Sequence, residues 1–242
     1  MQSLLSKIDS SNLPQHIAVI MDGNGRWAKK QNKPRTYGHQ SAIEAVQAVI
    51  KACGSAKIKY LTLYAFSTEN WNRSTTEINI LFKLLSETIQ NELETFLKEE
   101  IKLLIIGNRT KIPQKINQSL DEIVEKTKNN TKGTLTVALD YGSKEEIISC
   151  TKKIAQLVKE NKIEIEDINE SLVENNLYTK NLPKVDLLIR TSGEQRISNF
   201  LLWQIAYAEL YFTPVLWPDF REVDLYKAII DYQSRDRRYG AA

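Results

Sequence analysis

Short apolar runs rich in β-branched residues alternate along this chain of 242 residues with longer segments of helical periodicity. The apolar runs cover residues 17–21, 60–66, 103–106, 135–139 and 185–189, and the amphipathic segments cover 41–52, 76–98, 114–127 and 144–159. Strands that alternate with helices are typical of a mostly parallel sheet with helices on its faces. No Pro- or Gly-rich linker and no internal repeat interrupts the pattern. We therefore predict an α/β fold with a single domain over residues 1–242.

The charge balance and the distribution of apolar residues argue against two classes of partner. The chain has 33 Lys and Arg against 30 Asp and Glu, a net charge of +3, which does not indicate a nucleic-acid-binding protein. Residues 1–15 lack the apolar core of a secretory signal, and no apolar run reaches the roughly 18 residues that a membrane-spanning helix needs. We expect a cytoplasmic protein that binds no nucleic acid.

Cysteine usage fits the same compartment. The chain contains only Cys53 and Cys150, which form no C-x-x-C pair, so reduced structural thiols are expected. With His16 and His39 as the only histidines, the residues for a zinc site are scarce.

The segment that follows the first predicted strand suggests a site for magnesium and a diphosphate. It reads Asp22-Gly23-Asn24-Gly25-Arg26-Trp27. Two glycines two positions apart allow backbone N–H groups to face an anion, a carboxylate suits Mg²⁺, and a guanidinium can fork onto phosphate. The Walker and dinucleotide glycine patterns are both absent, and an ordinary Asp-Gly/Asn-Gly turn explains the same letters.

Polar residues also follow two other predicted strands. Residues 67–73 follow the second strand, and residues 190–196 follow the fifth. Ligands of open α/β sheets bind beyond the carboxyl ends of the strands, so three polar clusters at such ends favour one shared site.

Taken together, these clusters resemble those of the cis-prenyltransferases, the undecaprenyl diphosphate synthase family. The resemblance extends over residues 16–240. It rests on the blocks H-I-A-V-I-M-D-G-N-G-R-W-A from His16, Y-G-H from Tyr37, Y-A-F-S-T-E-N-W-N-R from Tyr64, D-L-L-I-R-T-S-G-E from Asp186, R-I-S-N-F-L-L-W-Q from Arg196, A-E-L-Y-F from Ala208 and W-P-D-F from Trp217.

The resemblance implies a homodimeric enzyme that condenses isopentenyl diphosphate onto an allylic diphosphate and forms a new cis double bond. Farnesyl diphosphate is the expected primer, and a long-chain product such as the undecaprenyl carrier lipid of cell-wall synthesis is expected. The product would also give the protein loose, peripheral contact with a membrane. The D-D-x-x-D motif of the all-helical trans-prenyltransferases is absent.

Substrate and metal roles follow from the same resemblance. Mg²⁺ is assigned to Asp22 and Glu209. The allylic diphosphate is assigned to Gly23, Asn24, Gly25, Arg26, Trp27, Arg35 and His39. The diphosphate of isopentenyl diphosphate is assigned to Arg190, Arg196 and Ser198. Arg238-Tyr239-Gly240 resembles a C-terminal R-x-G that reaches a neighbouring subunit in many members. Without the resemblance, Arg35 is equally well explained as a solvated loop arginine, and Glu209 suggests a partly buried ion pair.

Catalysis and substrate positioning are assigned to the block after the second strand. It supplies Ser67, Thr68, Glu69, Asn70, Trp71 and Arg73. A proton must leave C2 of isopentenyl diphosphate, and no free base is evident. A relay through Ser67, Asn70 and Asp22 or the released pyrophosphate itself could accept it.

Three alternatives remain open at this stage. Apolar residues at helical spacing in 76–98 either pack in the core or line a cavity for a lipid chain, together with strand 135–139. The product is either long, or short to medium in length. A non-catalytic partner subunit of the same fold is disfavoured because Asp22 and Arg26 are retained. One departure from the family is Asp140-Tyr141-Gly142-Ser143-Lys144, where many bacterial members have N-Y-G-G-[RK].

Overall fold

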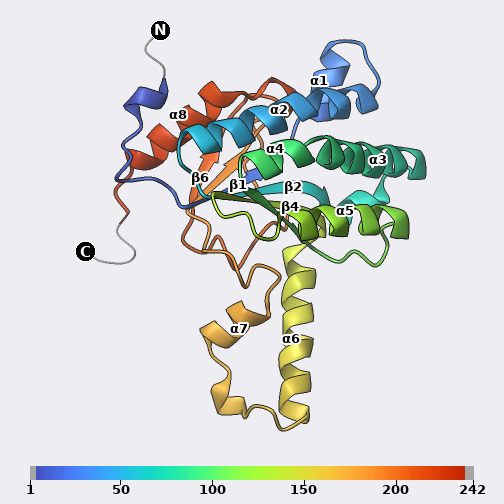
Figure 1. Cartoon of the computed structure of the whole chain (residues 1–242), viewed down its shortest axis with the longest axis vertical. Coiled ribbons are helices and arrows are strands. Elements are labelled where there is room, and N and C mark those ends of the chain that lie inside the picture. Colours follow the sequence, from blue (N-terminus) through green and yellow to red (C-terminus); the bar gives the residue numbers. More distant parts are fainter. Residues whose placement is uncertain (1–3, 238–242) are drawn as a thin grey trace.

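A parallel six-stranded sheet forms the centre of the computed structural model, which describes residues 4–237 (Figure 1). The strand order is β3-β4-β2-β1-β5-β6, and every neighbouring pair is parallel. The strands are β1 (His16–Ile20), β2 (Tyr60–Ser67), β3 (Ile101–Ile106), β4 (Gly133–Tyr141), β5 (Leu187–Arg190) and β6 (Glu209–Phe212). The predicted α/β class and its five strands are confirmed, and β6 is an additional strand.

The helices follow the strands as βα alternation requires. They are α1 (Asn24–Lys30), α2 (Arg35–Ser55), α3 (Thr75–Asn91), α4 (Leu93–Lys98), α5 (Gln114–Thr127), α6 (Ser143–Lys159), α7 (Glu170–Asn176) and α8 (Glu222–Gln233). Short 3₁₀ segments are η1 (Leu4–Lys7), η2 (Thr68–Asn72), η3 (Ile165–Asp167) and η4 (Trp217–Asp219).

Alternate side chains of the central strands supply two apolar layers. Ile17 and Val19 of β1 pack in the larger cluster with α2, α3, α5 and α8. Ala18 and Ile20 point to the opposite face, against Phe200 and its neighbours. Because β1 is buried on both faces, it reads as a continuous apolar run, which is why the sequence reveals it.

The helix boundaries differ from the periodicity in two places that matter for the site. The predicted helix at 41–52 extends to Arg35–Ser55, so Arg35 and His39 lie on its first turns. The predicted segment 76–98 is two helices, α3 and α4, which meet at Glu92. The apolar pattern continues through this break, so periodicity alone does not reveal it.

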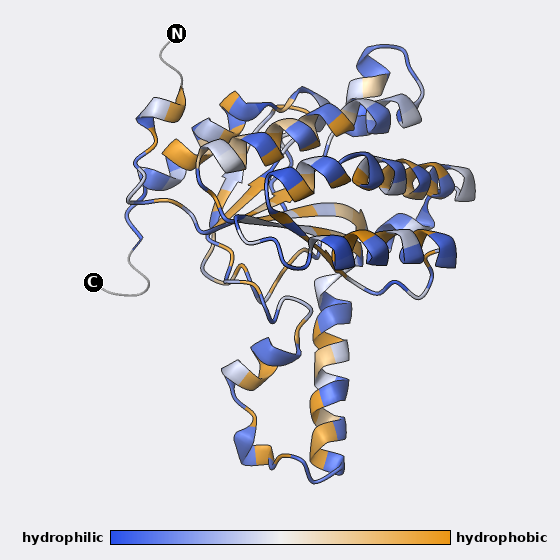
Figure 2. Ribbon diagram, in the orientation of Figure 1, coloured by the Kyte–Doolittle hydropathy of each residue, from blue (hydrophilic) through white to orange (hydrophobic). Residues whose placement is uncertain are grey.

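Helices α6 and α7 project from one end of the sheet as an arm (Figure 1). A small cluster around Cys150, Ile154 and Leu177 holds the arm together. Figure 2 shows apolar and polar residues interspersed along α6. Cys53 and Cys150 are both buried and carry free thiols. Over residues 4–237, none of the helices combines the length and apolarity needed to span a bilayer.

Candidate active site

A cavity of about 400 Å³ opens at the carboxyl ends of β1, β2 and β5 and extends between α2 and α3. Polar side chains lie at one end of it, and they include Asp22, Asn24, His39, Ser67, Asn70, Arg73, Arg190, Arg196 and Ser198. The remainder is lined almost entirely by apolar side chains of α2, α3, β2 and β4. The predicted shared site at the strand ends is therefore formed, with an apolar chamber behind it.

The sequence predicts that residues 76–98 either pack in the core or line a cavity, and the structure shows both. Leu81, Leu85 and Ile89 of α3 line the cavity, as do Leu135 and Val137 of β4, whereas Ile78 packs in the core. One helix thus packs in the core and lines the cavity, because the apolar residues of α3 cover a face broad enough for both contacts.

Asp22, Arg190, Arg196 and Ser198 form what we call the strand-end cluster. Arg190 is the last residue of β5, is only 4% exposed, and donates to Asp22 Oδ2 at 2.9 Å and to Ser198 Oγ at 2.7 Å. It also donates to the Arg196 carbonyl oxygen. The guanidinium of Arg190 is thus held by both segments that flank the mouth.

The loop that carries this cluster has an unusual backbone. Ser192, Ser198 and Asn199 have φ values of 79°, 46° and 60°, in the left-handed region that residues other than glycine rarely adopt. Such conformations concentrate at ligand sites, where the surrounding structure holds them. The loop therefore has the character of a binding loop.

Asp22 is ionised at neutral pH. Burial acts to raise its pKa, but hydrogen bonding and charge from Arg190, with help from Ser192 and Arg26, outweigh that effect, and the pKa of Asp22 is lowered. An ionised carboxylate with a partly exposed side chain beside arginines is suited to holding a cation that the phosphate oxygens also bind.

Arg26 does not join the other residues predicted for the allylic diphosphate. Its guanidinium donates to the Ser192 carbonyl at 3.0 Å and to Ser192 Oγ at 2.5 Å, and lies 3.3 Å from Glu194. It is also 3.7 Å from Asp22. Arg26 therefore lies beside the strand-end cluster.

Arg35, His39, Arg73 and Glu77 form a second group, which we call the helix cluster. A single oxygen, Glu77 Oε1, lies 3.2 Å from Arg35 Nε, 3.2 Å from Arg73 Nη1 and 3.5 Å from His39 Nε2. One carboxylate offsets only part of the charge of two arginines. The helix cluster is therefore an electropositive site that suits a diphosphate.

His39 is neutral in this arrangement. Burial lowers its pKa to about 4, with contributions from the charges of Arg73 and Arg35 that outweigh the opposing effect of Glu77. Its Nδ1 is 3.2 Å from Asn24 Nδ2, which links the histidine to the first loop.

Three buried polar atoms around the mouth lack a hydrogen-bond partner. They are Asn24 Oδ1, His39 Nε2 and Arg190 Nε. Buried groups of this kind are rare without a functional reason, and here all three belong to residues that line one cavity. They mark a place where a polar ligand would complete the hydrogen bonding.

The segment predicted as an anion-binding loop is mostly helical. Residues 24–27 are the first turn of α1, and only Asp22 and Gly23 precede it. Gly23 has φ 111°, and an added Cβ would lie 2.9 Å from Leu216 Cδ2, so glycine is required there. At Gly25 an added Cβ would be 3.3 Å from Arg35 Cγ, so this glycine lets Arg35 approach. Trp27 lies outside the cavity lining and donates to Asp219 Oδ1 at 2.6 Å.

The block after β2 is the 3₁₀ turn η2. Ser67 caps the turn, and its N–H donates to Asn70 Oδ1 at 3.1 Å. Ser67, Asn70 and Arg73 line the cavity, whereas Thr68, Glu69 and Trp71 do not. Glu69 instead accepts from Asn199 Nδ2 at 3.0 Å.

Trp71 explains the departure at Asp140. Its indole N–H donates to Asp140 Oδ1 at 2.6 Å, and Asp140 is buried with φ 49°. An amide oxygen could accept the same bond, so the change from the family pattern is compatible with the observed geometry.

Glu209 is not brought to Asp22 within one chain. Glu209 begins β6, where it pairs with Leu187 at the start of β5. Asp22 follows β1, whose last residue, Ile20, pairs with Arg190 at the end of β5. Several residues of strand rise separate the two carboxylates, roughly 15 Å. Glu209 instead accepts from Arg235 at 2.7 Å. Within residues 4–237, no three His, Cys, Asp or Glu side chains converge as a metal site.

Glu77 is the principal residue that sequence reasoning missed. The pattern Ser74-Thr75-Thr76-Glu77 is a capping-box signature, and Ser74 Oγ accepts from the Glu77 N–H at 3.3 Å. The signature predicts the start of α3 but not the two arginines that converge on the glutamate.

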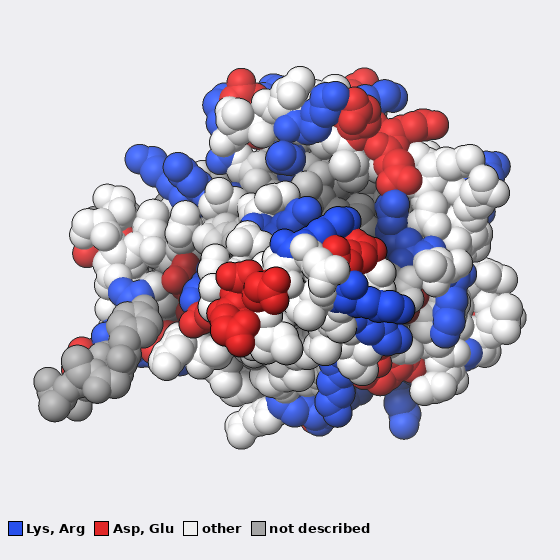
Figure 3. Space-filling model, turned by 90° about the horizontal axis from the view of Figure 1, so that it is seen from below, with Lys and Arg blue, Asp and Glu red and all other residues white. Residues whose placement is uncertain are grey.

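Basic and acidic side chains are mixed over the face in Figure 3, so this face does not carry a field of one sign. The predicted role of Arg238-Tyr239-Gly240 lies outside the described residues.

Comparisons with known proteins agree with the geometry. Residues 20–240 match the Prenyltransf family model of undecaprenyl diphosphate synthases. The chain is 51% identical over 232 residues to the ditrans,polycis-undecaprenyl-diphosphate synthase ((2E,6E)-farnesyl-diphosphate specific) of Haemophilus ducreyi, with 96% of each chain covered. It is 49% identical over 228 residues to the isoprenyl transferase of Clostridium perfringens, covering 94% of this chain and 90% of that protein.

Solved structures give the same result. Lavandulyl diphosphate synthase of Lavandula x intermedia, in complex with dimethylallyl diphosphate, matches with a TM-score of 0.91 and 33% identity over 94% of this chain and 98% of that one. A probable undecaprenyl diphosphate synthase of Campylobacter jejuni matches with a TM-score of 0.78 and 33% identity over 95% and 99%.

Proposed function

The chain belongs to the undecaprenyl diphosphate synthase family of cis-prenyltransferases, and from this premise we propose that it adds isopentenyl diphosphate units successively to farnesyl diphosphate. Each addition forms a cis double bond. The product is a long-chain polyprenyl diphosphate such as undecaprenyl diphosphate, which serves as carrier lipid for peptidoglycan and thus cell-wall synthesis.

One observation carries this proposal. Two separate cationic groups contribute side chains to the polar end of a single apolar cavity: Arg190 and Arg196 come from the strand-end cluster, and Arg73 comes from the helix cluster. The reaction joins two diphosphates and stores a growing hydrocarbon chain, so it requires two anion sites and one apolar chamber. A P-loop nucleotide-binding protein would need neither the chamber nor the second cationic group.

The two clusters divide the substrates. The helix cluster, with Asn24 and the start of α1, holds the allylic diphosphate, and its hydrocarbon enters the chamber. Arg190, Arg196 and Ser198 hold isopentenyl diphosphate. Arg26 contacts Ser192 beside the strand-end cluster, so its role toward the allylic diphosphate remains part of this proposal.

The residues at the mouth fit Mg²⁺. Asp22 is ionised, and Mg²⁺ typically takes one or two carboxylates together with phosphate oxygens and water. When bound there with the allylic diphosphate, the metal offsets charge on the leaving group. Asp22 would hold the ion, Arg190 fixes the Asp22 carboxylate, and the arginines would orient the phosphates.

Proton removal follows bond formation. The isopentenyl double bond attacks C1 of the allylic substrate, diphosphate leaves with the electron pair of the C–O bond, and the resulting cation loses a proton from C2. Ser67 and Asn70 line the cavity, where they can orient the substrate or relay that proton to diphosphate.

We propose a homodimer that is cytoplasmic and contacts membranes only peripherally. Trp203, Tyr207 and Leu210 are exposed near the edge strand β6, and such apolar surface suits a second subunit. The metal role of Glu209, also on β6, then requires that assembly or a rearrangement to bring it near a diphosphate.

The likeness to lavandulyl diphosphate synthase favours one competing function, condensation of short substrates without long elongation. The relatives named as farnesyl-diphosphate-specific undecaprenyl diphosphate synthases favour long-chain synthesis instead.

Product analysis distinguishes these functions. The purified protein is given radiolabelled isopentenyl diphosphate with farnesyl or dimethylallyl diphosphate, with and without Mg²⁺. Long products from farnesyl diphosphate that require Mg²⁺ would support the proposal. If only dimethylallyl diphosphate serves as primer, and the product results from a single condensation, the short-chain function is supported. Absence of incorporation with either primer would contradict both functions.

A further inference from the structure

The segment that joins α1 to α2 carries a dense group of positive charges. Residues 23–43 contain no acidic side chain, and they contain five basic ones, which are Arg26, Lys29, Lys30, Lys33 and Arg35. The whole chain has 33 basic and 30 acidic residues, so these five exceed its entire surplus of positive charge. Basic residues at this density are typical of a surface that meets a polyanion.

Three of the five cations are not committed to the site. Arg26 and Arg35 contact acidic residues of the site already described. The other three are exposed and form no ion pair among residues 4–237, and they are Lys29, Lys30 and Lys33. Lysines in the last turn of a helix stabilise its dipole, which accounts for two of them in α1 but not for Lys33 beyond it.

The turn that presents these lysines has a defined backbone. The Lys33 N–H donates to the Ala28 carbonyl oxygen at 2.9 Å, and Asn32 has φ 56°, so the chain reverses tightly after α1. In Figure 1 the segment between α1 and α2 projects at one corner of the molecule. None of the three lysines lines the cavity of the site. Their charge therefore faces outward on a projecting turn.

An aromatic pair lies beside these charges. The rings of Trp27 and Tyr37 stack with centroids 5.8 Å apart, and Lys33 Nζ lies 5.8 Å from the centroid of the Tyr37 ring. Tyr37 is 38% exposed. Lysines next to Trp and Tyr are characteristic of surfaces that lie in the interface of an anionic bilayer, where such rings reach headgroup level. A small anion would instead be enclosed in a concave pocket.

From this arrangement we propose that the turn between α1 and α2 docks the protein on an anionic lipid bilayer. The residues that meet the bilayer, which we call the docking surface, are Lys29, Lys30, Lys33 and Tyr37. The lysines bind lipid headgroups, and the tyrosine ring enters the interface. Three lysines and one ring give weak, reversible binding, which differs from the insertion of an anchor.

The docking surface adjoins the site. Asn24 begins α1, His39 follows Tyr37 by two positions in α2, and both residues line the cavity. A bilayer at the docking surface would therefore lie beside the mouth. For its purpose the inference rests on the proposed function, because the allylic substrate and the product would then be diphosphates with long apolar chains, which accumulate in membranes.

Vesicle binding tests the proposal without any substrate. The protein is sedimented with vesicles of phosphatidylcholine and phosphatidylglycerol, and with vesicles of phosphatidylcholine alone. The test variant combines Lys29→Gln, Lys30→Gln and Lys33→Gln. Each lysine near an anionic surface strengthens binding about fivefold, so the loss of three should weaken it roughly 100-fold.

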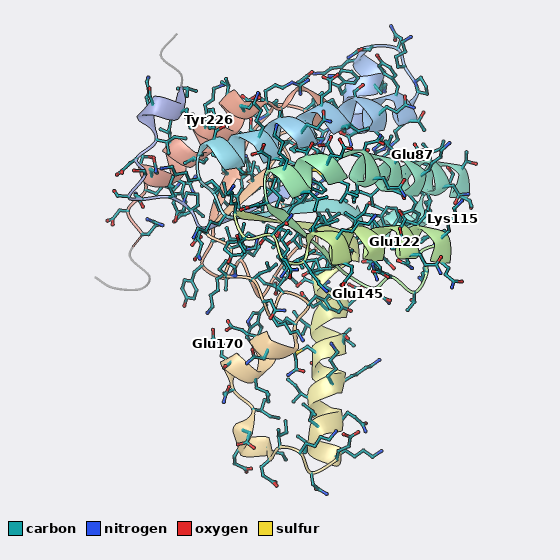
Figure 4. The ribbon with its side chains drawn as sticks, in the orientation of Figure 1. Glu87, Lys115, Glu122, Glu145, Glu170 and Tyr226 are labelled. Carbon is teal, nitrogen blue, oxygen red and sulfur yellow. The ribbon has the colours of Figure 1, made fainter. Side chains whose placement is uncertain are left out.

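A matched control removes the same charge elsewhere. It combines Lys115→Gln, Lys126→Gln and Lys152→Gln, which are exposed lysines of α5 and α6. Lys115, labelled in Figure 4, lies away from the segment between α1 and α2. A further variant, Tyr37→Ser, leaves the charge unchanged and separates entry into the interface from general attraction of polyanions. Thermal unfolding checks that every variant is folded.

The expected result is selective. The unmodified protein and the control variant bind the anionic vesicles at low salt, added salt weakens this binding, and the test variant binds them no better than it binds phosphatidylcholine alone. Tyr37→Ser should bind several-fold more weakly. The proposal is overturned if the unmodified protein ignores anionic vesicles, if both triple variants lose binding equally, or if Tyr37→Ser binds as the unmodified protein does.

Turnover separates this proposal from the proposed function. Because the lysines of the docking surface do not line the cavity, the test variant should condense isopentenyl diphosphate at the unmodified rate when vesicles are absent. Loss of that turnover in the folded variant would contradict a docking role and place the lysines in the site. If the unmodified protein binds anionic vesicles but incorporates no isopentenyl diphosphate, the proposed function fails while docking is supported.

Discussion

The strand-end cluster and the helix cluster hold similar charges on different supports. Arg190 ends a strand buried on both faces, and its guanidinium is fixed by Asp22, Ser198 and a backbone carbonyl. Arg35 and Arg73 instead share one oxygen of Glu77, and Arg35 is 53% exposed. The first site is preorganised by the sheet, whereas the second depends on how α2 and α3 lie against each other.

This difference suits the two substrates. Isopentenyl diphosphate is the same molecule in every cycle, so a rigid site is an advantage. Under the proposed assignment, the allylic substrate gains five carbons in each cycle and is held by the helix cluster. A site in which two arginines share one carboxylate oxygen can rearrange when the bound substrate changes.

The largest expected effect is at Asp22. Asp22→Asn removes the charge that holds Mg²⁺ but retains the size of the side chain, so turnover should fall about 100- to 1,000-fold or more at saturating Mg²⁺. Circular dichroism and thermal unfolding should show a folded protein. Asp121→Asn, which alters an exposed ion pair, is the matched control. Near-normal turnover in Asp22→Asn would remove Asp22 from the proposed mechanism.

Arg196→Ala tests the role of the strand-end cluster in binding isopentenyl diphosphate. Arg196 lines the cavity and is 61% exposed, so its loss should not disturb the core. The variant loses hydrogen bonds to a charged diphosphate, so we expect KM for isopentenyl diphosphate to rise roughly 10- to 100-fold. KM for farnesyl diphosphate should change less. Steady-state kinetics with each substrate varied in turn provide the measurement. The reverse order would show that the two sites are exchanged.

Arg35→Ala tests the helix cluster. Because Arg73 remains beside Glu77, we expect a smaller increase, roughly 3- to 10-fold, in KM for farnesyl diphosphate. KM for isopentenyl diphosphate should change less. If the two KM values rise together, the clusters are not separate sites.

The smallest effect concerns His39 and stability. Its pKa is about 4 in the folded protein and about 6.5 in an unfolded chain, so the unfolded state binds more protons between these values. The free energy of unfolding should therefore fall as the pH drops from about 6.5 towards 4. His39→Gln should reduce this slope in urea denaturation. An equal slope in both proteins would show that His39 titrates normally.

The sequence predicts the parts of the site that follow buried strands. The apolar run before Asp22 and the run that ends in Arg190 are continuous because both strands are covered on both faces. Parallel strands then bring their polar ends together. The family resemblance adds Ser198, Asn70 and His39 to the same place, and the structure puts all three in the cavity lining.

Other features depend on packing that a linear pattern does not contain. Glu77 reads as a helix-start residue, and only the approach of α2 to α3 surrounds it with cations. β6 is a short edge strand of mixed exposure, so its four residues give no clear period. The position of Glu209, far from Asp22, follows from the register of that strand.

The most direct test of the division between two diphosphate sites is calorimetric. Isopentenyl diphosphate and farnesyl thiodiphosphate, an analogue that does not react, are titrated separately into the unmodified protein, Arg196→Ala and Arg35→Ala. We predict that Arg196→Ala selectively loses affinity for isopentenyl diphosphate and that Arg35→Ala selectively loses affinity for the analogue. Equal losses of both ligands in either variant would contradict the division.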